Sequence, residues 1–172
     1  YTKPSAPTFV ACDQLNGGLR LTWSINTTGG ILEGFEFVKF MGSYDGGNSW
    51  IDLTNDTTNY VHSEQTPSYL FTGLTNGNPY TLKVYAVIKH DILNINVDGN
   101  ILSQGPFTPY GKPSAPIFDS CIERDGQLNV KWSAPASLGG LPINYYKVRV
   151  NEAAWINAGV NPSVDNPSGS IR

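Results

Sequence analysis

The side chains that could take part in catalysis are few in this chain, and they are scattered along it. His62 and His90 are the only histidines, and they fall in different predicted loops without a serine or cysteine nucleophile motif nearby. The acidic residues do not form the two-carboxylate arrangement that glycoside hydrolysis requires. No glycine-rich phosphate-binding loop follows a predicted strand. We therefore expect a protein that is not an enzyme, with no catalytic residues, no cofactor and no metal site.

A repeated segment sets the organisation of the chain. Lys3 to Ser24 reads KPSAPTFVACDQLNGGLRLTWS, and Lys112 to Ser133 reads KPSAPIFDSCIERDGQLNVKWS, at an offset of 109 residues without a gap. A matched period of this length indicates two copies of one domain. We expect a first domain at residues 1–111 and the N-terminal part of a second at residues 112–172.

The repeat gives each copy one cysteine at the same position, Cys12 and Cys121. A single cysteine cannot form a disulfide within its own domain. Equivalent points of neighbouring domains lie on the order of tens of Å apart, beyond the roughly 4.4–6.8 Å between the Cα atoms of a disulfide. We predict two free thiols, whose redox state and role the sequence leaves open.

The composition excludes several classes of partner. Charged residues make up 15% of the chain and the net charge is −3, so no basic surface is expected for nucleic acid or anionic membrane. The apolar runs are only a few residues long, too short to insert into a bilayer. Other protein chains, either flanking repeats or neighbouring surface or capsid proteins, remain as the expected partners.

Alternating apolar and polar residues in short runs predict β-strands throughout. Turn residues recur every 8–12 positions, which favours an antiparallel all-β sandwich. The predicted strands are residues 8–12, 18–25, 34–41, 49–54, 68–72, 79–89, 101–109, 117–121, 127–133 and 144–150, with a further strand near Trp155.

Four motifs together carry a family resemblance. They are PSAP in both copies, the G-x-L-x-[LV]-x-W pattern at Gly17–Trp23 and Gly126–Trp132, SAPASLGGLPINYYKV at Ser133–Val148, and LTNGNPYTLKVYAV at Leu74–Val87. The chain resembles tandem fibronectin type III domains, of the variety common in bacterial and large-virus surface proteins. The resemblance implies immunoglobulin-like sandwiches, with Tyr80 as a corner tyrosine whose hydroxyl bonds to backbone a few residues upstream.

The tryptophans of the repeat, Trp23 and Trp132, alternate with inward-facing apolar residues, so we expect both in cores. The second copy lacks the strand that contains the corner tyrosine and its partner. Its third strand is therefore expected to keep an open edge, and Trp132 to be poorly covered. We expect the rest of this domain beyond Arg172; the alternative is that another chain donates the missing strands.

Two further segments have turn signals. Ser43–Trp50 matches S-x-D-x-G-x-x-W, a hairpin seen in sialidases and other β proteins, and we interpret it as a structural turn in which the Asp45 carboxylate caps backbone N–H groups. In the long segment Lys89–Gln104, Asp98-Gly99 predicts a two-residue hairpin turn. This protruding hairpin is either a variable surface loop or a contact with a neighbouring protein, and in the second case the candidate partner-binding residues are His90, Asp91, Asn94, Asn96, Asp98 and Asn100.

The linker Tyr110–Pro116 contains two prolines and no flexible Gly-Ser tract. Because proline favours an extended backbone, we predict a semi-rigid spacer and an elongated rod.

These features predict a non-catalytic structural or adhesive array within a larger surface protein, which spaces its neighbours and contacts other proteins. The expected location is extracellular, on a cell surface or on a virion, where the protein could be capsid-associated. The alternative is an accessory spacer or carbohydrate-binding module of a secreted polysaccharide-degrading enzyme. Exposed planar aromatics would be needed for carbohydrate binding, and the only candidates are Tyr44, Tyr60 and Tyr69.

Overall fold

The computed structural model describes residues 3–25, 35–160 and 168–171. The chain divides into two compact units, Tyr1–Tyr110 (unit 1) and Gly111–Arg172 (unit 2). Every regular element described in either unit is a β-strand, and every strand pairing is antiparallel. The predicted all-β antiparallel fold is thus confirmed. Residue 34, the start of one predicted strand, lies outside the described residues.

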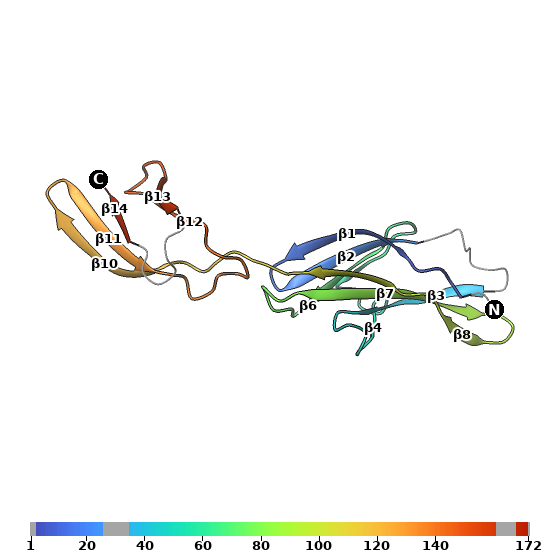
Figure 1. Cartoon of the computed structure of the whole chain (residues 1–172). Coiled ribbons are helices and arrows are strands. Elements are labelled where there is room, and N and C mark those ends of the chain that lie inside the picture. Colours follow the sequence, from blue (N-terminus) through green and yellow to red (C-terminus); the bar gives the residue numbers. More distant parts are fainter. Residues whose placement is uncertain (1–2, 26–34, 161–167, 172) are drawn as a thin grey trace. The chain divides into compact units, whose positions relative to one another are not determined.

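Unit 1 is a sandwich of two sheets (Figure 1). The first sheet has the order β1 (Thr8–Leu15), β2 (Gly18–Ser24), β6 (Ser68–Thr72) and β5 (Tyr60–Val61). The second has the order β4 (Ile51–Asp52), β3 (Phe35–Ser43) and β7 (Tyr80–His90), and both β8 (Ile95–Asp98) and β9 (Leu102–Phe107) pair with β7.

The core of unit 1 follows from the two-residue period of its strands. Alternate residues of β2, ending at Trp23, point between the sheets and are fully buried. The Trp23 ring meets the edge of Phe40 from the opposite sheet, with the ring centres 5.2 Å apart. Full burial of one large apolar side chain contributes roughly 1.5–3 kcal/mol, so this face stabilises the pairing of the sheets.

The repeat is visible in the strand register of unit 2. Its strands are β10 (Ile117–Arg124), β11 (Gln127–Ser133), β12 (Tyr145–Val148), β13 (Ile156–Val160) and β14 (Ser168–Ile171). The β10–β11 pair reproduces the β1–β2 register at the same offset, including a bulge at the same place.

The strand β14 was missed by the sequence analysis. It pairs with β11 as β6 pairs with β2, so that Leu128 faces Ile171 as Leu19 faces Phe71. Trp132 is only 7% exposed and packs edge-on against Tyr146, with ring centres 5.6 Å apart. The prediction that Trp132 would be poorly covered is therefore wrong, because β14 extends the sheet and Tyr146 closes over the indole.

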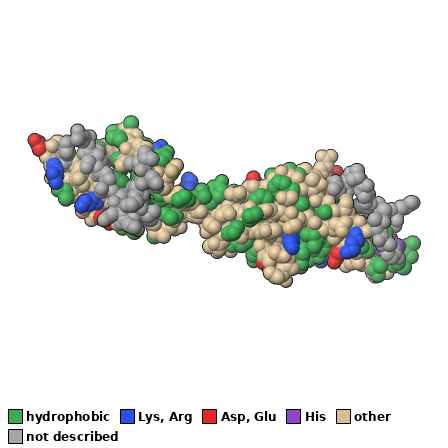
Figure 2. All heavy atoms as spheres, in the orientation of Figure 1, with side chains coloured by type: hydrophobic (Ala, Val, Ile, Leu, Met, Phe, Trp, Pro, Cys, Tyr) green, Lys and Arg blue, Asp and Glu red, His purple; other side chains and the backbone are tan. Residues whose placement is uncertain are grey.

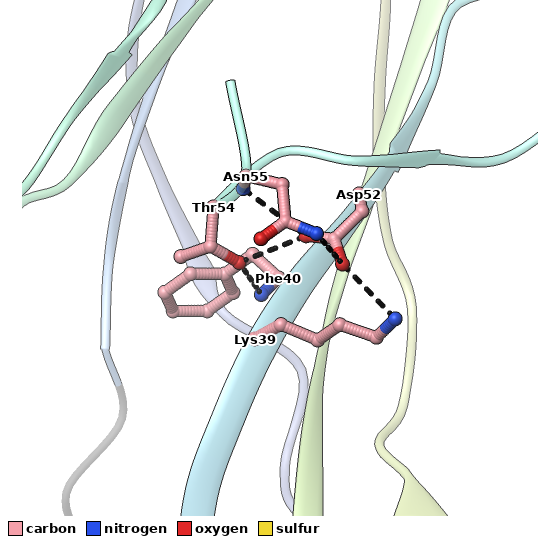
Figure 3. A network of polar contacts seen from close by, with 5 residues as sticks. All are labelled: Lys39, Phe40, Asp52, Thr54 and Asn55. Carbon is pink, nitrogen blue, oxygen red and sulfur yellow. Dashed lines mark hydrogen bonds and ion pairs between the residues drawn. The ribbon is translucent and has the colours of Figure 1, made fainter. Parts of the chain in front are cut away.

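Two other boundaries differ from the predictions. The strand predicted at 49–54 is reduced to β4, because the Asp52 carboxylate turns the chain (Figure 3). It accepts hydrogen bonds from the Thr54 hydroxyl at 3.1 Å and the Asn55 side-chain amide at 3.1 Å, and an ion pair joins it to Lys39 at 3.0 Å. The short strand β5 was not predicted, whereas the strand expected near Trp155 is present as β13.

The start of unit 2 is anchored by its own loop. The Gly111 N–H donates to the Gly139 carbonyl at 2.8 Å, and the Ser114 N–H donates to the Ser137 carbonyl at 2.9 Å. The linker is thus hydrogen-bonded to unit 2 at Gly111 and Ser114, and its two prolines restrict it further. The elongated rod stays a prediction.

The two cysteines are free, as predicted, but their environments differ. Burial, together with the charge of Asp13, raises the pKa of the Cys12 thiol to about 11, whereas Cys121 is exposed. Since the thiolate is the reactive form, we expect iodoacetamide at about pH 8 to alkylate Cys121 first. Mass spectrometry of the timed reaction checks this order, and equal rates at both sites would contradict it.

Candidate functional site

The protruding hairpin exists, but its turn is not where the sequence placed it. The chain turns at residues 91–94, where Asn94 takes a positive φ of 53°, and β8 then pairs with β7 from Ile95 opposite His90 to Asp98 opposite Val87. The predicted hairpin turn at Asp98-Gly99 is therefore wrong.

The Asp98-Gly99 segment instead brings the chain against the N-terminal segment. The Gly99 N–H donates to the Ala86 carbonyl at 2.8 Å, and the Asn100 N–H donates to the Pro4 carbonyl at 2.9 Å. A Cβ at position 99 would lie 3.0 Å from the Ala86 oxygen and 3.1 Å from the Pro4 Cβ. The glycine is needed here for close backbone approach, after which the chain rejoins β7 as β9.

His90 stabilises the turn of the hairpin. Its Nδ1 accepts hydrogen bonds from the backbone N–H groups of Ile92 at 3.2 Å and Leu93 at 3.3 Å. The His90 ring also packs against the Phe35 ring, with the ring centres 4.6 Å apart. The structure thus places this candidate binding residue as the last residue of β7, where it supports the turn.

The other five candidate residues are exposed along or just after the hairpin: Asp91, Asn94, Asn96, Asp98 and Asn100. The most exposed apolar side chains of the hairpin were not among the candidates. Ile92 is 86% exposed, Leu93 49% and Ile95 44%. We call residues 91–95 the hairpin tip. No sequence signal distinguished the hairpin tip, because the turn was predicted at Asp98-Gly99 and not at residues 91–94.

A partly exposed phenylalanine lies near the hairpin on the neighbouring strand, next to the buried Ile88. Phe37 on β3 pairs with Ile88 on β7, which pairs in turn with Val97 on β8, so the three side chains share one face of the sheet. Phe37 is still 39% exposed. Hydrophobic side chains gather at this end of unit 1 in Figure 2, where Figure 1 places β8. The exposed apolar side chains here are those of the hairpin tip together with Phe37, and exposed apolar side chains that lie together are typical of a protein contact.

The Ser43–Trp50 segment forms a closed network of its own. The Asp45 carboxylate accepts hydrogen bonds from the backbone N–H groups of Asn48 and Ser49, both at 3.0 Å, and from the hydroxyls of Ser43 and Ser49. Trp50 packs on Tyr85 with ring centres 4.7 Å apart. The carboxylate's acceptor positions are used within the turn, which supports the structural interpretation.

The pKa of Asp45 is a direct test of that interpretation. Hydrogen bonds from Ser49, then Ser43, hold the pKa of its carboxyl far below the usual 3.8. Since the folded pKa is lowered, the ionised carboxylate stabilises the turn above about pH 4, and this contribution is lost as the pH falls through the folded pKa. NMR titration of the Asp45 carboxyl carbon is expected to find it still ionised at about pH 3.

The Ser49→Ala variant is the matched comparison for this titration, because it removes the first donor and leaves the turn backbone in place. We expect its Asp45 midpoint to rise part of the way towards the ordinary value. An ordinary midpoint in the unsubstituted protein would contradict the network.

The three tyrosines considered for carbohydrate binding do not form an exposed platform. Tyr44 packs edge-on against Phe71 and Tyr80. Tyr69 is buried in the core, where its hydroxyl donates to the Asp56 carboxylate at 2.9 Å. Burial, and then this hydrogen bond, raises the pKa of Tyr69 to about 12. Tyr60 is half-buried against the same core.

The predicted core residues occupy the following places. Trp23 is fully buried in the core of unit 1, and Trp132 is buried in unit 2. Tyr80 lies at the edge of the core, where its hydroxyl accepts a hydrogen bond from the Thr75 backbone N–H at 3.0 Å.

Neither a metal centre nor a membrane span is found in the described part of the chain. Within residues 3–25, 35–160 and 168–171, no three His, Cys, Asp or Glu side chains are grouped so that they could hold a metal ion. In the same ranges there is no helix with the length and hydrophobicity to cross a bilayer.

The paired sheets, the repeated register and the exposed hairpin define a fibronectin type III-like β-sandwich protein. The chain is 27% identical over 136 residues to fibronectin type-III domain-containing protein 3A of Mus musculus. The match covers 79% of this chain and 10% of that protein, so the chain spans about a tenth of its relative's length. No family model matches the chain. Fold and relative agree on a fibronectin type III-like sandwich.

Proposed function

We propose that the chain is a contact and spacer module of a larger surface protein, in which unit 1 binds a neighbouring protein through the hairpin tip. The observation that carries this proposal is the exposure of Ile92, Leu93 and Ile95 at the end of a sheet. Desolvating such side chains against a partner yields about 25 cal/mol per Å² of apolar area, so a small tip can anchor a contact.

The structure of the hairpin supports a contact made by a preformed element. β8 pairs with β7 over four residue pairs, and the His90 Nδ1 accepts hydrogen bonds from two backbone N–H groups of the turn. A turn that is held in one conformation loses little conformational entropy on binding, which favours affinity. The polar residues Asp91, Asn94 and Asn96 would form the rim around the apolar centre.

A photo-crosslinking experiment on the native assembly tests the contact. The photoreactive residue benzoylphenylalanine replaces Ile92 in the full-length protein, which is expressed in its native host. After irradiation, mass spectrometry identifies the crosslinked proteins. We expect one dominant protein adduct. The matched control carries the same probe at Val61, which is also apolar and 52% exposed but lies on β5. Equal adducts at both positions, or none at position 92, would count against the proposal.

The location at a cell or virion surface is a separate part of the proposal, and it rests on the predicted resemblance to surface proteins. Antibodies against unit 1 applied to intact cells or particles are expected to bind without permeabilisation. Labelling only after permeabilisation would refute the surface location and would leave the hairpin contact to be judged by crosslinking alone.

A further inference from the structure

Unit 1 contains two Asn-Gly pairs, and its fold brings them together. Asn16-Gly17 forms the turn between β1 and β2, and Asn76-Gly77 lies in the segment 73–79 between β6 and β7. We call residues 73–79 the β6–β7 loop. Although the two asparagines are 60 residues apart in the sequence, their side chains are hydrogen-bonded to each other. This contact has chemical consequences, because Asn-Gly is a reactive sequence.

Asn-Gly pairs are prone to spontaneous deamidation. The backbone nitrogen of the glycine attacks the side-chain carbonyl carbon of the asparagine, and the new C–N bond closes a succinimide ring. The –NH2 group departs as ammonia with the amide proton of the glycine. Water then opens the ring to give aspartate or isoaspartate, and nothing is oxidised or reduced. Glycine permits this attack, since it has no side chain to hinder the approach.

The Asn76 side chain holds both reacting groups of the first pair. The Gly17 N–H donates to the Asn76 Oδ1 at 2.8 Å, and the Asn76 Nδ2 donates to the Asn16 Oδ1 at 2.7 Å. Because a backbone N–H can only donate, the Asn76 oxygen must face Gly17, and this fixes the orientation of both amides. The Gly17 nitrogen and the Asn16 carbonyl therefore have to leave Asn76 before they can meet.

The second pair is held by a different partner. The Gly77 N–H donates to the Pro109 carbonyl at 2.9 Å, so the attacking nitrogen of this pair is also engaged. The side-chain amide that it would attack is that of Asn76, which is fixed by its bonds to Asn16 and Gly17. Neither pair can react while these bonds are in place.

The β6–β7 loop and the β1–β2 turn are tied together as one structure. The Leu74 N–H donates to the Gly17 carbonyl at 3.0 Å, and the Leu74 side chain is buried in the core. The Tyr80 hydroxyl accepts a hydrogen bond from the Thr75 N–H at 3.0 Å. Asn16 is nevertheless exposed, so solvent reaches this site. Hydrogen bonds, and not exclusion of water, keep the reacting atoms apart.

We propose that the β6–β7 loop protects two deamidation sites, Asn16 and Asn76, and that both become modified when this loop opens. One opening breaks the bonds that hold Gly17 and Gly77, because the Asn76 side chain and the Gly77 N–H belong to the same loop. The rate of modification then follows the fraction of time for which the loop is open. This inference is independent of the hairpin contact, since none of these residues belongs to the hairpin tip.

Modification has a lasting effect on unit 1. An aspartate at position 76 lacks the side-chain N–H groups with which Asn76 holds Asn16, so the first reaction weakens the protection of the second site. An isoaspartate at position 16 adds a methylene group to the backbone of the turn that pairs Leu15 with Gly18. Because this turn sets the register of β1 and β2, the modified turn disturbs the first sheet.

The test compares the chain of 172 residues with two synthetic peptides, residues 13–20 and 73–80, at neutral pH. Mass spectrometry of proteolytic fragments follows deamidation at each asparagine. We expect both sites to react about tenfold more slowly in the folded chain, or slower still, since a loop-opening free energy of about 1.4 kcal/mol already gives this factor. Slow amide hydrogen exchange is expected at Gly17 and Gly77. Rates equal to those of the peptides would overturn the proposal.

The variant Asn76→Ala removes both the acceptor of the Gly17 N–H and the donor to Asn16. We expect deamidation of Asn16 to become about tenfold faster and to approach the rate of the peptide. The matched control is Asn78→Ala, because Asn78 is exposed in the same loop and takes no part in these bonds. An unchanged rate in Asn76→Ala, or an equal acceleration in Asn78→Ala, would overturn the role of Asn76.

The variant Tyr80→Phe tests the loop without changing either Asn-Gly pair. It removes the hydroxyl that accepts the Thr75 N–H and keeps the ring that packs at the edge of the core. We expect both asparagines to deamidate faster than in the unsubstituted chain, and circular dichroism verifies that the variant remains folded. If both rates stay the same although exchange at the Thr75 amide becomes faster, loop opening does not control the reaction and the proposal fails.

Discussion

The variant Trp23→Ala is expected to lose about 3–5 kcal/mol of the free energy of unfolding of unit 1, the range measured for removal of a large aromatic from a core. The indole is fully buried between the sheets and packs edge-on against the Phe40 ring, with the ring centres 5.2 Å apart. Alanine would leave a cavity that the rigid strands cannot fill. Because domains of this size have a total stability of only about 5–15 kcal/mol, the loss is a large fraction of the total.

Urea denaturation followed by circular dichroism measures this loss, and amide hydrogen exchange on β2 and β7 assigns it to unit 1. The matched control is Trp50→Ala, because Trp50 is half-buried and packs on Tyr85 outside the core. We expect a cost of about 1 kcal/mol there. Similar losses for the two variants would show that the two-sheet core is not what stabilises unit 1.

The variant Gly139→Ala is expected to have a large effect in unit 2, because it breaks the anchoring of the linker. A Cβ at this position would lie 2.2 Å from the Gly111 carbonyl oxygen, which is a backbone atom that cannot move aside alone. Gly139 also has a positive φ of 71°, which costs roughly 1–2 kcal/mol for a residue with a side chain. We expect a total loss of about 3 kcal/mol, with faster amide exchange at Gly111 and Ser114.

Gly126→Ala separates the clash from the backbone strain. Gly126 has a nearly equal positive φ of 66°, but no atom lies within 4 Å of the position its Cβ would take. This variant should therefore lose only the strain cost of roughly 1–2 kcal/mol and leave the linker amides protected. If both variants cost the same, contact between the linker and the Gly139 loop contributes little.

A hydrogen-bonded linker and a preformed hairpin would serve the same purpose in the spacer module that we propose. The hydrogen bond from Gly111 to Gly139 limits the freedom of the linker where it enters unit 2. The contacts of His90 limit the freedom of the hairpin tip in unit 1. Both reduce the entropy that would be lost when a larger assembly orders the module.

The polar and apolar halves of the candidate site differed in how well the sequence revealed them. Asn94, Asn96 and Asp98 were identified because polar residues in a long connection indicate an exposed loop. Ile92 and Leu93 were missed, since an apolar pair in an unassigned segment is equally typical of a buried strand. Their exposure, 86% and 49%, depends on where the turn falls.

The sequence by itself determined the strand pattern and the repeat. Side chains alternate across a strand, so the pattern at Leu19–Trp23 is enough to assign both the strand and its buried face. Matched residues at a constant offset were likewise enough to predict that β10–β11 would repeat β1–β2.

Only the tertiary structure decided where the hairpin turns and how Trp132 is covered. Asp98-Gly99 has the local preference for a tight turn, but the hydrogen bond from Asn100 to Pro4, far away in the sequence, directs the chain elsewhere. β14 is a Ser-Gly-Ser-Ile segment with little strand preference of its own, and it is a strand because the edge of β11 is there to pair with. Local patterns encode periodicity and turn preference, whereas pairing between distant segments is decided by the contacts that become possible once the sheets have formed.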